Sequence, residues 1–483
     1  MTQPLPRRDS SQRQGGTIRD TMSDKRHYHF IGVCGTAMGS VAAAMQARGL
    51  TVTGSDQHVY PPMSTFLEEC GVGIMEGYRA SNIPESVDVT IIGNTISRGN
   101  EEAEEVLNRR LLYQSLPEVL KEQFLRGKRN FVVTGTHGKT TTSAILAWVL
   151  RSAGRDPSFM IGGIPTNFGC AAQFTDSDFV VLEGDEYDTA FFDKRSKFLH
   201  YLPEFVTINN IEFDHADIYD SLDDIKLTFR RLLNIVPNQG LAVVNGDDAN
   251  VLEVVRDAPC PVRTIGFGEQ CEVRIEEVLY EPEGSSFTLV GERYHLPMVG
   301  EFNVRNAAMA VAGGLFAGLP PEEIRTAFTS FEGIARRQQL CGEVRGVKVV
   351  DDFAHHPTAI GLAVGALRQR YPGSRLWVIF EPRSNTTRRN IFQSELADAL
   401  ATADRSVVPA IADLEKFPEG ERLDPEKLIR DVNERGGNAC YLETVDEIAN
   451  HVAAQAEEGD VVAVLSNGGF GGLHGKLLEK LGE

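Results

Sequence analysis

The chain has 483 residues, of which 42% are hydrophobic and 24% charged, an ordinary globular composition. At roughly 100–200 residues per domain, this length predicts about three domains. The formal net charge of -20 argues against general binding to nucleic acid or to an anionic membrane surface, because such a chain repels phosphate. Any anionic ligand must therefore be held by local basic side chains and helix ends.

Cysteine usage and the absence of long apolar runs indicate a cytoplasmic chain. The seven cysteines are scattered and form no CxxC pair, which favours reduced thiols over disulfides or a structural zinc site. No window approaches about 18 consecutive apolar residues, so no membrane span is predicted. Residues 1–26 are polar and lack the apolar core of a secretion signal, so we expect a disordered tail or a late start codon. We expect a monomer or a weak homo-oligomer.

The first domain is predicted for residues 27–128 and begins with a strand–helix–strand unit. His29–Val33 is a short apolar run, typical of a buried strand, that leads into a glycine turn. Met38–Arg48 is rich in alanine and predicts a helix, which Leu50–Thr53 follows as a second strand. Val87–Ile92 predicts a third strand.

Two further domains are predicted for residues 129–337 and 338–483. A polar, basic stretch, Lys121–Asn130, separates the first domain from the second. Apolar runs that alternate with helical patterns indicate α/β domains with mainly parallel sheets. The expected strands are Phe131–Thr134, Phe179–Leu182, Phe205–Ile208, Leu241–Val244, Val347–Val350, Leu376–Ile379 and Asp460–Leu465. The expected helix is Val304–Leu319.

The most informative stretch is the glycine-rich segment Gly135–Thr142, G-T-H-G-K-T-T-T, between an apolar strand and a helix. A nucleoside triphosphate needs backbone N–H groups, a positive helix end, a lysine and a hydroxyl for Mg²⁺. Lys139 is expected to bind the β- and γ-phosphates, and Thr140 the metal. Val133 stands where the common motif has its first glycine, so the alternative is a plain strand–helix turn with an exposed lysine.

Acidic residues follow two of the expected strands. Both groups stand at the carboxyl ends of parallel strands, where α/β sheets bind ligands and where oxygen ligands can hold Mg²⁺. The alternative for either group alone is a solvated acidic loop. The first group is Glu183, Asp185, Glu186 and Asp188, and the second is Asn209, Asn210, Glu212, Asp214, His215 and Asp217.

These motifs, in this order, resemble those of the Mur ligase family from about His29 to Lys476. The resemblance implies a Rossmann-like UDP-binding domain, a central P-loop ATPase-like domain and a C-terminal Rossmann-like domain. It also implies an enzyme of peptidoglycan synthesis that forms a C–N bond with ATP and Mg²⁺. Phe302 departs from the family, in which many members have histidine. The other motifs that carry the resemblance are Asn303–Asn306, Arg336-Arg337 and Asp351–Pro357.

Within the family, several segments resemble the branch that joins UDP-N-acetylmuramate to the tripeptide L-alanyl-γ-D-glutamyl-meso-diaminopimelate in peptidoglycan recycling. The nearest alternative is the branch that adds L-alanine alone, which typically has P-H-R-Y-T-R where this chain has P-R-S-N-T-T. Remoter alternatives are a P-loop phosphohydrolase, a nucleotide switch and a UDP-sugar sensor. The segments are Gly35–Gly39, Val59–Thr65, Gly99-Asn100, Glu186–Phe198 and Glu381–Thr386.

The resemblance further implies that ATP phosphorylates the muramyl carboxylate and that the peptide amine then attacks the acyl phosphate. The implied catalytic residues are Lys139, Glu183 and His215, and the implied metal ligands are Thr140, Glu183 and His215. The implied ATP-binding residues are Gly135, Thr136, His137, Gly138, Lys139, Thr140, Thr141, Asn303, Asn306, Arg337 and Asp352.

The outer domains are expected to bind the other two substrates. The turn Gly32–Gly39 lacks the GxGxxG spacing of an NAD site but offers backbone donors for a pyrophosphate. Arg383 suits a peptide carboxylate, whereas His355 either orients substrate or caps the helix before Pro357. The expected UDP-sugar residues are Gly35, Thr36, Met38, Asp56, Thr65, Asn94 and Ser97, and the expected peptide-binding residues are His355, Arg383, Ser384 and Asn385.

Overall fold

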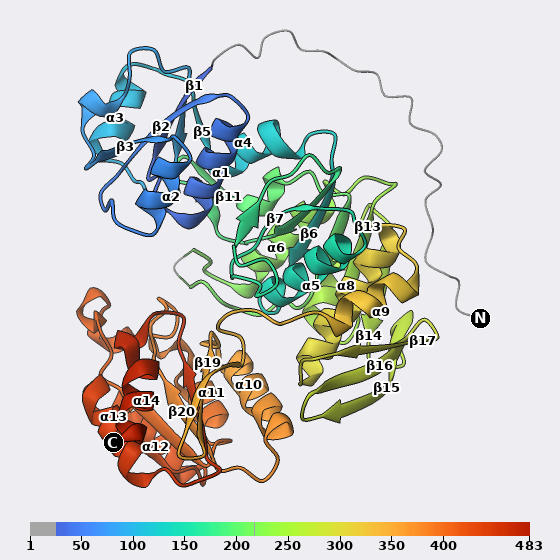
Figure 1. The fold of residues 1–483 in the computed structure, drawn as a ribbon, viewed down its shortest axis with the longest axis vertical. Helices are drawn as coiled ribbons and strands as arrows, with labels where there is room; N and C mark the ends of the chain where they lie inside the picture. The colour runs from blue at the N-terminus through green and yellow to red at the C-terminus, as the bar shows by residue number, and fades with distance from the viewer. Residues whose placement is uncertain (1–25, 217) are drawn as a thin grey trace.

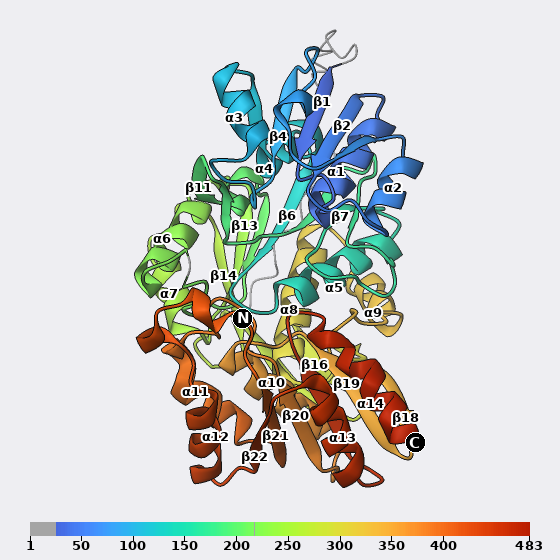
Figure 2. The ribbon, with the colours of Figure 1, turned by 90° about the vertical axis from the view of Figure 1, so that its left-hand side faces the viewer.

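The computed structural model describes residues 26–216 and 218–483 and contains three α/β domains, each with its own main sheet. The middle domain, green to yellow in Figure 1, lies between the blue first domain and the orange-to-red C-terminal domain, and the same order is seen in Figure 2. The expected tail at residues 1–26 lies outside the described residues, apart from Arg26. Among the described residues, the helices are too short or too polar to cross a membrane.

The first domain has a five-stranded parallel sheet. Its elements are β1 (His27–Ile31), α1 (Thr36–Ala47), β2 (Thr51–Asp56), α2 (Met63–Glu69), β3 (Gly73–Glu76), β4 (Val89–Ile92), α3 (Glu101–Asn108), β5 (Tyr113–Ser115) and α4 (Leu116–Leu120). The strand order is β3-β2-β1-β4-β5, so the apolar strand β1 is central and buried. Helix α1 follows the glycine turn directly, which places its N-terminus at the carboxyl edge of the sheet.

The polar stretch after α4 is structured rather than a loose linker. Lys121–Leu125 forms a π-helical turn, and the next strand, β6 (Arg129–Thr134), starts within the stretch. The Asn130 side chain is buried, and its Nδ2 donates to the carbonyls of Leu125 (3.1 Å) and Leu202 (3.0 Å). A buried amide that satisfies two turn carbonyls explains why a polar residue begins a buried strand.

The middle domain has a ten-stranded sheet with a parallel centre. Besides β6, its elements are α5 (Lys139–Ser152), β7 (Ser158–Met160), β8 (Ala172–Gln173), β9 (Phe179–Glu183), β10 (Asp188–Ala190), β11 (Asp193–Ser196), β12 (Phe205–Ile208), α6 (Leu222–Leu233), β13 (Leu241–Asn245), α7 (Ala249–Val255), β14 (Val262–Gly266), β15 (Val273–Glu281), β16 (Gly284–Leu289), β17 (Glu292–Leu296), α8 (Glu301–Phe316) and α9 (Pro321–Thr329). The order is β17-β16-β15-β14-β13-β12-β6-β9-β7-β8, and β10 pairs with β11 as a separate hairpin.

Strands β15–β17 form an antiparallel extension that the expectation of mainly parallel sheets misses. The sequence of β15, V-R-I-E-E-V-L-Y-E, is largely exposed, with one fully buried position. Antiparallel strands with one solvated face mix polar and apolar residues, whereas the buried parallel strands are continuous apolar runs. Apolar runs therefore mark the centre of this sheet and not its edge.

The C-terminal domain has a six-stranded sheet in the order β18-β19-β23-β20-β21-β22, in which β18 is antiparallel. Every strand and helix expected from the sequence is present in the three domains, with ends that differ by a few residues. The elements of this domain are β18 (Gln339–Val344), β19 (Val347–Asp352), α10 (Pro357–Arg370), β20 (Leu376–Phe380), α11 (Gln393–Leu400), β21 (Arg405–Pro409), α12 (Pro425–Glu434), β22 (Ala439–Leu442), α13 (Val445–Gln455), β23 (Val461–Leu465) and α14 (Leu473–Gly482).

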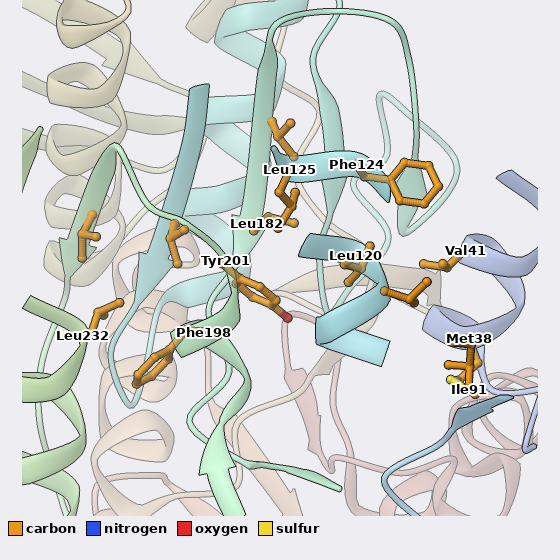
Figure 3. Close-up of a cluster of buried hydrophobic side chains, with 14 of the residues drawn as sticks. Met38, Val41, Ile91, Leu120, Phe124, Leu125, Leu182, Phe198, Tyr201 and Leu232 are labelled. Carbon is orange, nitrogen blue, oxygen red and sulfur yellow. The ribbon is translucent and has the colours of Figure 1, made fainter. Parts of the chain in front are cut away.

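A single cluster of buried hydrophobic side chains crosses from the first domain into the middle domain (Figure 3). Met38 of α1 belongs to it, as do Leu120 and Phe124 from the connecting segment and Leu182 and Tyr201 from the middle domain. Burying a large apolar side chain contributes about 1.5–3 kcal/mol, so separating the two domains would expose a costly surface. This shared core fixes the position of the first domain beside the carboxyl edge of the middle sheet.

Candidate active site

The turn between β6 and α5 lies at the carboxyl edge of the middle sheet. Gly135 and Gly138 have φ values of 126° and 82°, a region that glycine enters without strain. A Cβ on Gly138 would overlap the Asn306 side chain, and one on Gly135 would press on the backbone of Asn209. Both glycines are therefore required by backbone conformation and by the close packing of this loop.

Lys139, the first residue of α5, is largely buried, with 13% of its side chain exposed, so the alternative of an exposed loop lysine is wrong. Its Nζ donates to the carbonyls of Gly135 (2.7 Å) and Thr136 (3.1 Å) and to Glu186 Oε1 (3.0 Å). Burial opposes the charged form, but the carboxylate of Glu186 and its neighbours outweigh it and raise the pKa of Lys139. The ammonium is thus held, charged, inside the phosphate loop.

Thr140 and Glu183 lie together below the loop. Thr140 Oγ1 donates to Glu183 Oε1 at 3.0 Å, and the amide of Gly162 donates to Glu183 Oε2 at 2.6 Å. Burial raises the pKa of Glu183 more than the charge of Lys139 lowers it, so this carboxylate lacks a full counter-charge. Mg²⁺ binds six oxygen ligands at about 2.0–2.1 Å in an octahedron, so two neighbouring ligand oxygens lie about 2.9 Å apart. The spacing and the oxygen donors of this pair fit Mg²⁺.

His215 contacts Glu186 rather than the Thr140–Glu183 pair. Its Nε2 lies 3.0 Å from Glu186 Oε1, the oxygen that also accepts from Lys139. Burial lowers the pKa of His215, but its hydrogen bond to Glu186 and that carboxylate's charge outweigh burial and raise the pKa. The sequence offered Glu186 only as one member of an acidic group, whereas the structure places it between two of the predicted catalytic side chains.

The other predicted ATP-binding residues of the middle domain pack around the loop. Asn303 and Asn306 of α8 are buried, and Thr141 is buried in α5. Asn209 Nδ2 lies 3.4 Å from Asn306 Oδ1, and Asn303 Nδ2 donates to the carbonyl of Val299 at 2.8 Å. Asn306 therefore packs against the loop at Gly138, whereas Asn303 bonds within the start of α8.

Arg337 and Asp352 lie at the connection between the middle and C-terminal domains. The Arg337 guanidinium lies over the Phe353 ring, 5.0 Å from its centroid, and its charge acts to lower the pKa of Glu183. Asp352 Oδ2 accepts from the amide of Gln338 at 2.9 Å, and burial raises the pKa of this aspartate. The connection thus brings one cation within electrostatic reach of the candidate metal site.

A cavity of about 350 Å³ lies between the first and middle domains. The glycine turn, the start of α1 and the loop after β4 form one wall, where four of the expected UDP-sugar residues lie: Gly35, Thr36, Met38 and Asn94. Loops after β7, β9 and β11 form the other wall, which includes Glu183. The cavity therefore connects the predicted nucleotide-sugar turn with the candidate metal site.

The remaining three expected UDP-sugar residues do not line this cavity. Asp56 Oδ2 accepts from the amide of Cys34 at 2.9 Å and so holds the glycine turn in place. Thr65 is exposed on α2. Ser97 is exposed in the loop after β4, where its carbonyl accepts a hydrogen bond from the backbone amide of Asn100. Of these three residues, Asp56 is the one that contacts the glycine turn in the described part of the chain.

The predicted peptide-binding segment follows β20 at the carboxyl edge of the C-terminal sheet. Arg383 is half-exposed, and its NH1 lies 3.7 Å from Glu381 Oε1, which is a long and partly solvated ion pair. The Ser384 hydroxyl lies 2.8 Å from that of Thr387 within a local turn, and Asn385 is exposed. Among residues 26–216 and 218–483, this ion pair with Glu381 leaves most of the guanidinium donors of Arg383 available.

His356, and not His355, caps helix α10. His356 Nδ1 accepts from the amide of Thr358 at 3.3 Å. His355 Nδ1 instead donates to the carbonyl of Phe353 at 3.1 Å. The helix-capping alternative for His355 is therefore wrong, because the next residue already performs that role.

Family models match all three domains of the chain. The model described as "Mur ligase family, catalytic domain" matches residues 27–128, "Mur ligase middle domain" matches residues 133–314, and "Mur ligase, glutamate ligase domain" matches residues 336–468. The chain belongs to the Mur ligase family. The order of the matched models follows the order of the three observed domains.

Individual relatives match this Mur ligase over nearly its whole length. A protein of Escherichia coli K12, named UDP-N-acetylmuramate--L-alanyl-gamma-D-glutamyl-meso-2,6-diaminoheptandioate ligase, is 41% identical over 462 residues, which are 94% of this chain and 98% of that protein. The UDP-N-acetylmuramate--L-alanine ligase of Variovorax paradoxus is 30% identical, over 94% of this chain and 95% of that protein. A solved murein peptide ligase from Psychrobacter arcticus aligns with a TM-score of 0.69 and 35% identity, over 95% and 99% of the two chains.

A cluster of polar side chains connects the phosphate loop of this Mur ligase to its C-terminal domain. Glu212 Oε2 lies 3.3 Å from His137 Nε2 and 3.5 Å from His356 Nδ1, and it accepts from the Thr358 hydroxyl at 2.7 Å. The two imidazole rings lie 4.7 Å apart. Sequence reasoning missed this cluster because its members come from three distant segments. It makes the contact between the two domains sensitive to protonation.

We expect this contact to weaken in acid. The pKa of His356 is lowered from 6.5 to about 4, mainly by burial and secondly by the charge of the neighbouring His137. A histidine with a depressed folded pKa contributes stability above pH 6.5, and this contribution is lost as the pH falls towards 4. Wild type should therefore lose roughly 1–2 kcal/mol of stability between pH 7 and pH 5 relative to His356→Asn, since asparagine retains the helix cap. Chemical unfolding of both proteins at the two pH values measures this; equal losses would contradict it.

Proposed function

We propose that this Mur ligase joins UDP-N-acetylmuramate to L-alanyl-γ-D-glutamyl-meso-diaminopimelate, with ATP and Mg²⁺, in cytoplasmic peptidoglycan recycling. The observation that carries the proposal is the higher identity, over equal shares of this chain, to the tripeptide ligase (41%) than to the L-alanine ligase (30%). The cavity that connects the glycine turn with Glu183 supports it, because a bare phosphohydrolase or nucleotide switch has no use for a second substrate site there. We further propose that the enzyme acts as a monomer or weak homo-oligomer.

The reaction brings two anions together. A carboxylate oxygen of the muramyl group attacks the γ-phosphorus of ATP, and ADP leaves with the electron pair of the broken P–O bond. The peptide amine then attacks the carbonyl carbon of the acyl phosphate, loses a proton, and displaces inorganic phosphate. Each step needs cations and fixed donors where negative charge develops.

The residues around the phosphate loop suit the first step. The Lys139 ammonium is held charged at the loop by two carbonyls and Glu186, so it is in place to neutralise the γ-phosphate. Thr140 and Glu183 would hold Mg²⁺, which when bound neutralises further phosphate charge. Thr140 is buried and 13% of the Lys139 side chain is exposed, which limits competition from water for these contacts. Glu186 bonds to both Lys139 and His215 and so holds these two side chains together.

Product mass spectrometry tests the proposed function. Purified protein is incubated with UDP-N-acetylmuramate, ATP, Mg²⁺ and an equimolar mixture of tripeptide and L-alanine. The expected product is the UDP-muramyl-tripeptide, formed together with ADP and phosphate. A product that contains L-alanine alone would replace the proposal with the L-alanine ligase, and ATP hydrolysis with no amide product would indicate a phosphohydrolase.

Arg383 is expected to select the peptide. A tripeptide carries carboxylates far from its reacting amine, and losing a charge-assisted contact to one of them costs roughly 1.5–3 kcal/mol. Arg383→Ala should therefore raise the KM for tripeptide about ten- to a hundredfold. The KM values for ATP and UDP-N-acetylmuramate should stay nearly fixed, because the residues expected to bind them lie on the first and middle domains, apart from Asp352. Steady-state kinetics with each substrate varied in turn checks this; a common shift in all three KM values would show a structural role instead.

A further inference from the structure

The cavity between the first and middle domains has an uneven charge distribution. Two of the described residues that line it are acidic, Glu183 and Asp185, and Lys197 is its one basic side chain. Both acids lie on the middle-domain wall, towards the candidate metal site. A carboxylate that enters this end of the cavity would be repelled unless a cation faces it. Lys197 is the side chain that can supply that charge.

A hairpin anchored on the first domain positions Lys197. Lys197 directly follows β11, and β11 lies at the boundary between the two domains in Figures 1 and 2. At the tip of the hairpin, Phe192 packs edge-on against Tyr113 of the first domain, with ring centroids 4.8 Å apart. The backbone amide of Lys197 donates to the carbonyl of Tyr187 at 3.1 Å. The lysine is therefore fixed relative to both walls of the cavity.

The Lys197 ammonium keeps donor capacity for a ligand. Its Nζ donates to Asp185 Oδ2 at 2.8 Å, and 21% of its side chain is exposed. An ammonium has three N–H donors, and among the described residues the Asp185 contact is the one hydrogen bond that Nζ makes. The Tyr187 ring lies on another side, with its centroid 5.7 Å from Nζ. Asp185 thus orients the cation without saturating it.

We propose that Lys197 binds the carboxylate of the muramyl substrate and holds it for phosphorylation. The proposal rests on the proposed function, which supplies a nucleotide sugar with two anionic groups, the diphosphate and the carboxylate. The diphosphate matches the other wall, where the turn before α1 presents backbone donors at a helix N-terminus. Lys197 shares its wall with Glu183, which would bind the Mg²⁺ that accompanies ATP. The group that must react with ATP is the carboxylate, so Lys197 faces the reacting end of the substrate.

The experiment compares two nucleotide sugars that differ in this carboxylate. UDP-N-acetylglucosamine has the same diphosphate and sugar but lacks the lactyl group. Binding of each to the full-length protein is measured by calorimetry without ATP. Wild type should prefer UDP-N-acetylmuramate by about ten- to a hundredfold, the value of a charge-assisted contact of roughly 1.5–3 kcal/mol. Lys197→Met should bind the two ligands with affinities within about threefold of each other.

Matched variants separate recognition from structure. Lys194→Met removes a lysine of the same hairpin that pairs with Asp188 on the surface, and it should keep the wild-type preference. The double variant Lys197→Met/Asp185→Asn leaves no unpaired carboxylate and should behave like Lys197→Met. An undiminished preference in Lys197→Met, or an equal loss of affinity for both ligands, would overturn the assignment while leaving the proposed function intact. Failure of wild type to bind UDP-N-acetylmuramate would instead overturn both.

Discussion

Replacement of Lys139 by alanine is expected to abolish ligation, with a fall in kcat of at least about a hundredfold. The ammonium is buried, charged and held in the phosphate loop by Gly135, Thr136 and Glu186. Its removal takes away the main side-chain cation at the γ-phosphate, and no nearby lysine of the loop can replace it. Coupled measurement of ADP release and amide formation checks this. Activity within about tenfold of wild type, equal to about 1.4 kcal/mol, would reject the role of Lys139.

The same variant needs a stability control, because Lys139 is one partner of a buried ion pair. Removing one partner of such a pair costs about 3–5 kcal/mol, since the other charge stays buried. The double variant Lys139→Ala/Glu186→Gln removes both charges and should unfold closer to wild type than Lys139→Ala does. It should remain inactive in ligation. Recovery of activity in the double variant would show that the single variant failed through misfolding, and not through loss of the phosphate contact.

The contrast between Lys139 and Glu186 shows how far the sequence could predict this site. The loop that contains Lys139 can be predicted from one short segment of sequence, because its strand, two glycines, lysine and helix follow one another closely along the chain. The partner of Lys139 is 47 residues away, and Glu186 is 29 residues from His215. Contacts between residues so far apart along the chain leave no recognisable pattern in a single sequence. The sequence therefore predicts the loop but not the ion pair that Lys139 makes within it.

The same physical distinction applies to the fold. Buried parallel strands such as β12 and β20 are continuous apolar runs, and they were predicted nearly to the residue. The antiparallel strand β15 is largely exposed and mixes charges with apolar residues, so no apolar run marks it. Contacts between domains, such as Glu212 with His356, depend on how sheets are placed relative to one another. Family resemblance implied the domains, but only the structure places these side chains together.

Glu183→Gln is expected to raise the Mg²⁺ concentration for half-maximal activity by more than about tenfold. The substitution removes an anionic ligand at nearly constant size, and even loss of an outer-shell partner of a metal site commonly costs about 10- to 100-fold in affinity. The new amide side chain can still accept from the amide of Gly162 and pair with the hydroxyl of Thr140, so the loop should keep its shape. Binding of UDP-N-acetylmuramate without ATP and Mg²⁺ should not weaken, because Lys197 is the proposed partner of its carboxylate and loss of the Glu183 charge reduces repulsion at that end of the cavity.

Stability provides an independent readout of the same carboxylate. Burial raises the pKa of Glu183, so its ionised form is disfavoured in the folded protein without a metal. A carboxyl group with a raised folded pKa contributes stability below its unfolded pKa, and this contribution is lost as the pH rises. At neutral pH the neutral glutamine should therefore leave the metal-free protein at least as stable as wild type, while Mg²⁺ with ATP stabilises wild type more than the variant. Thermal unfolding with and without Mg²⁺-ATP measures both effects. If the two proteins had equal Mg²⁺ titrations and equal ligand-induced shifts in Tm, Glu183 would not be a metal ligand.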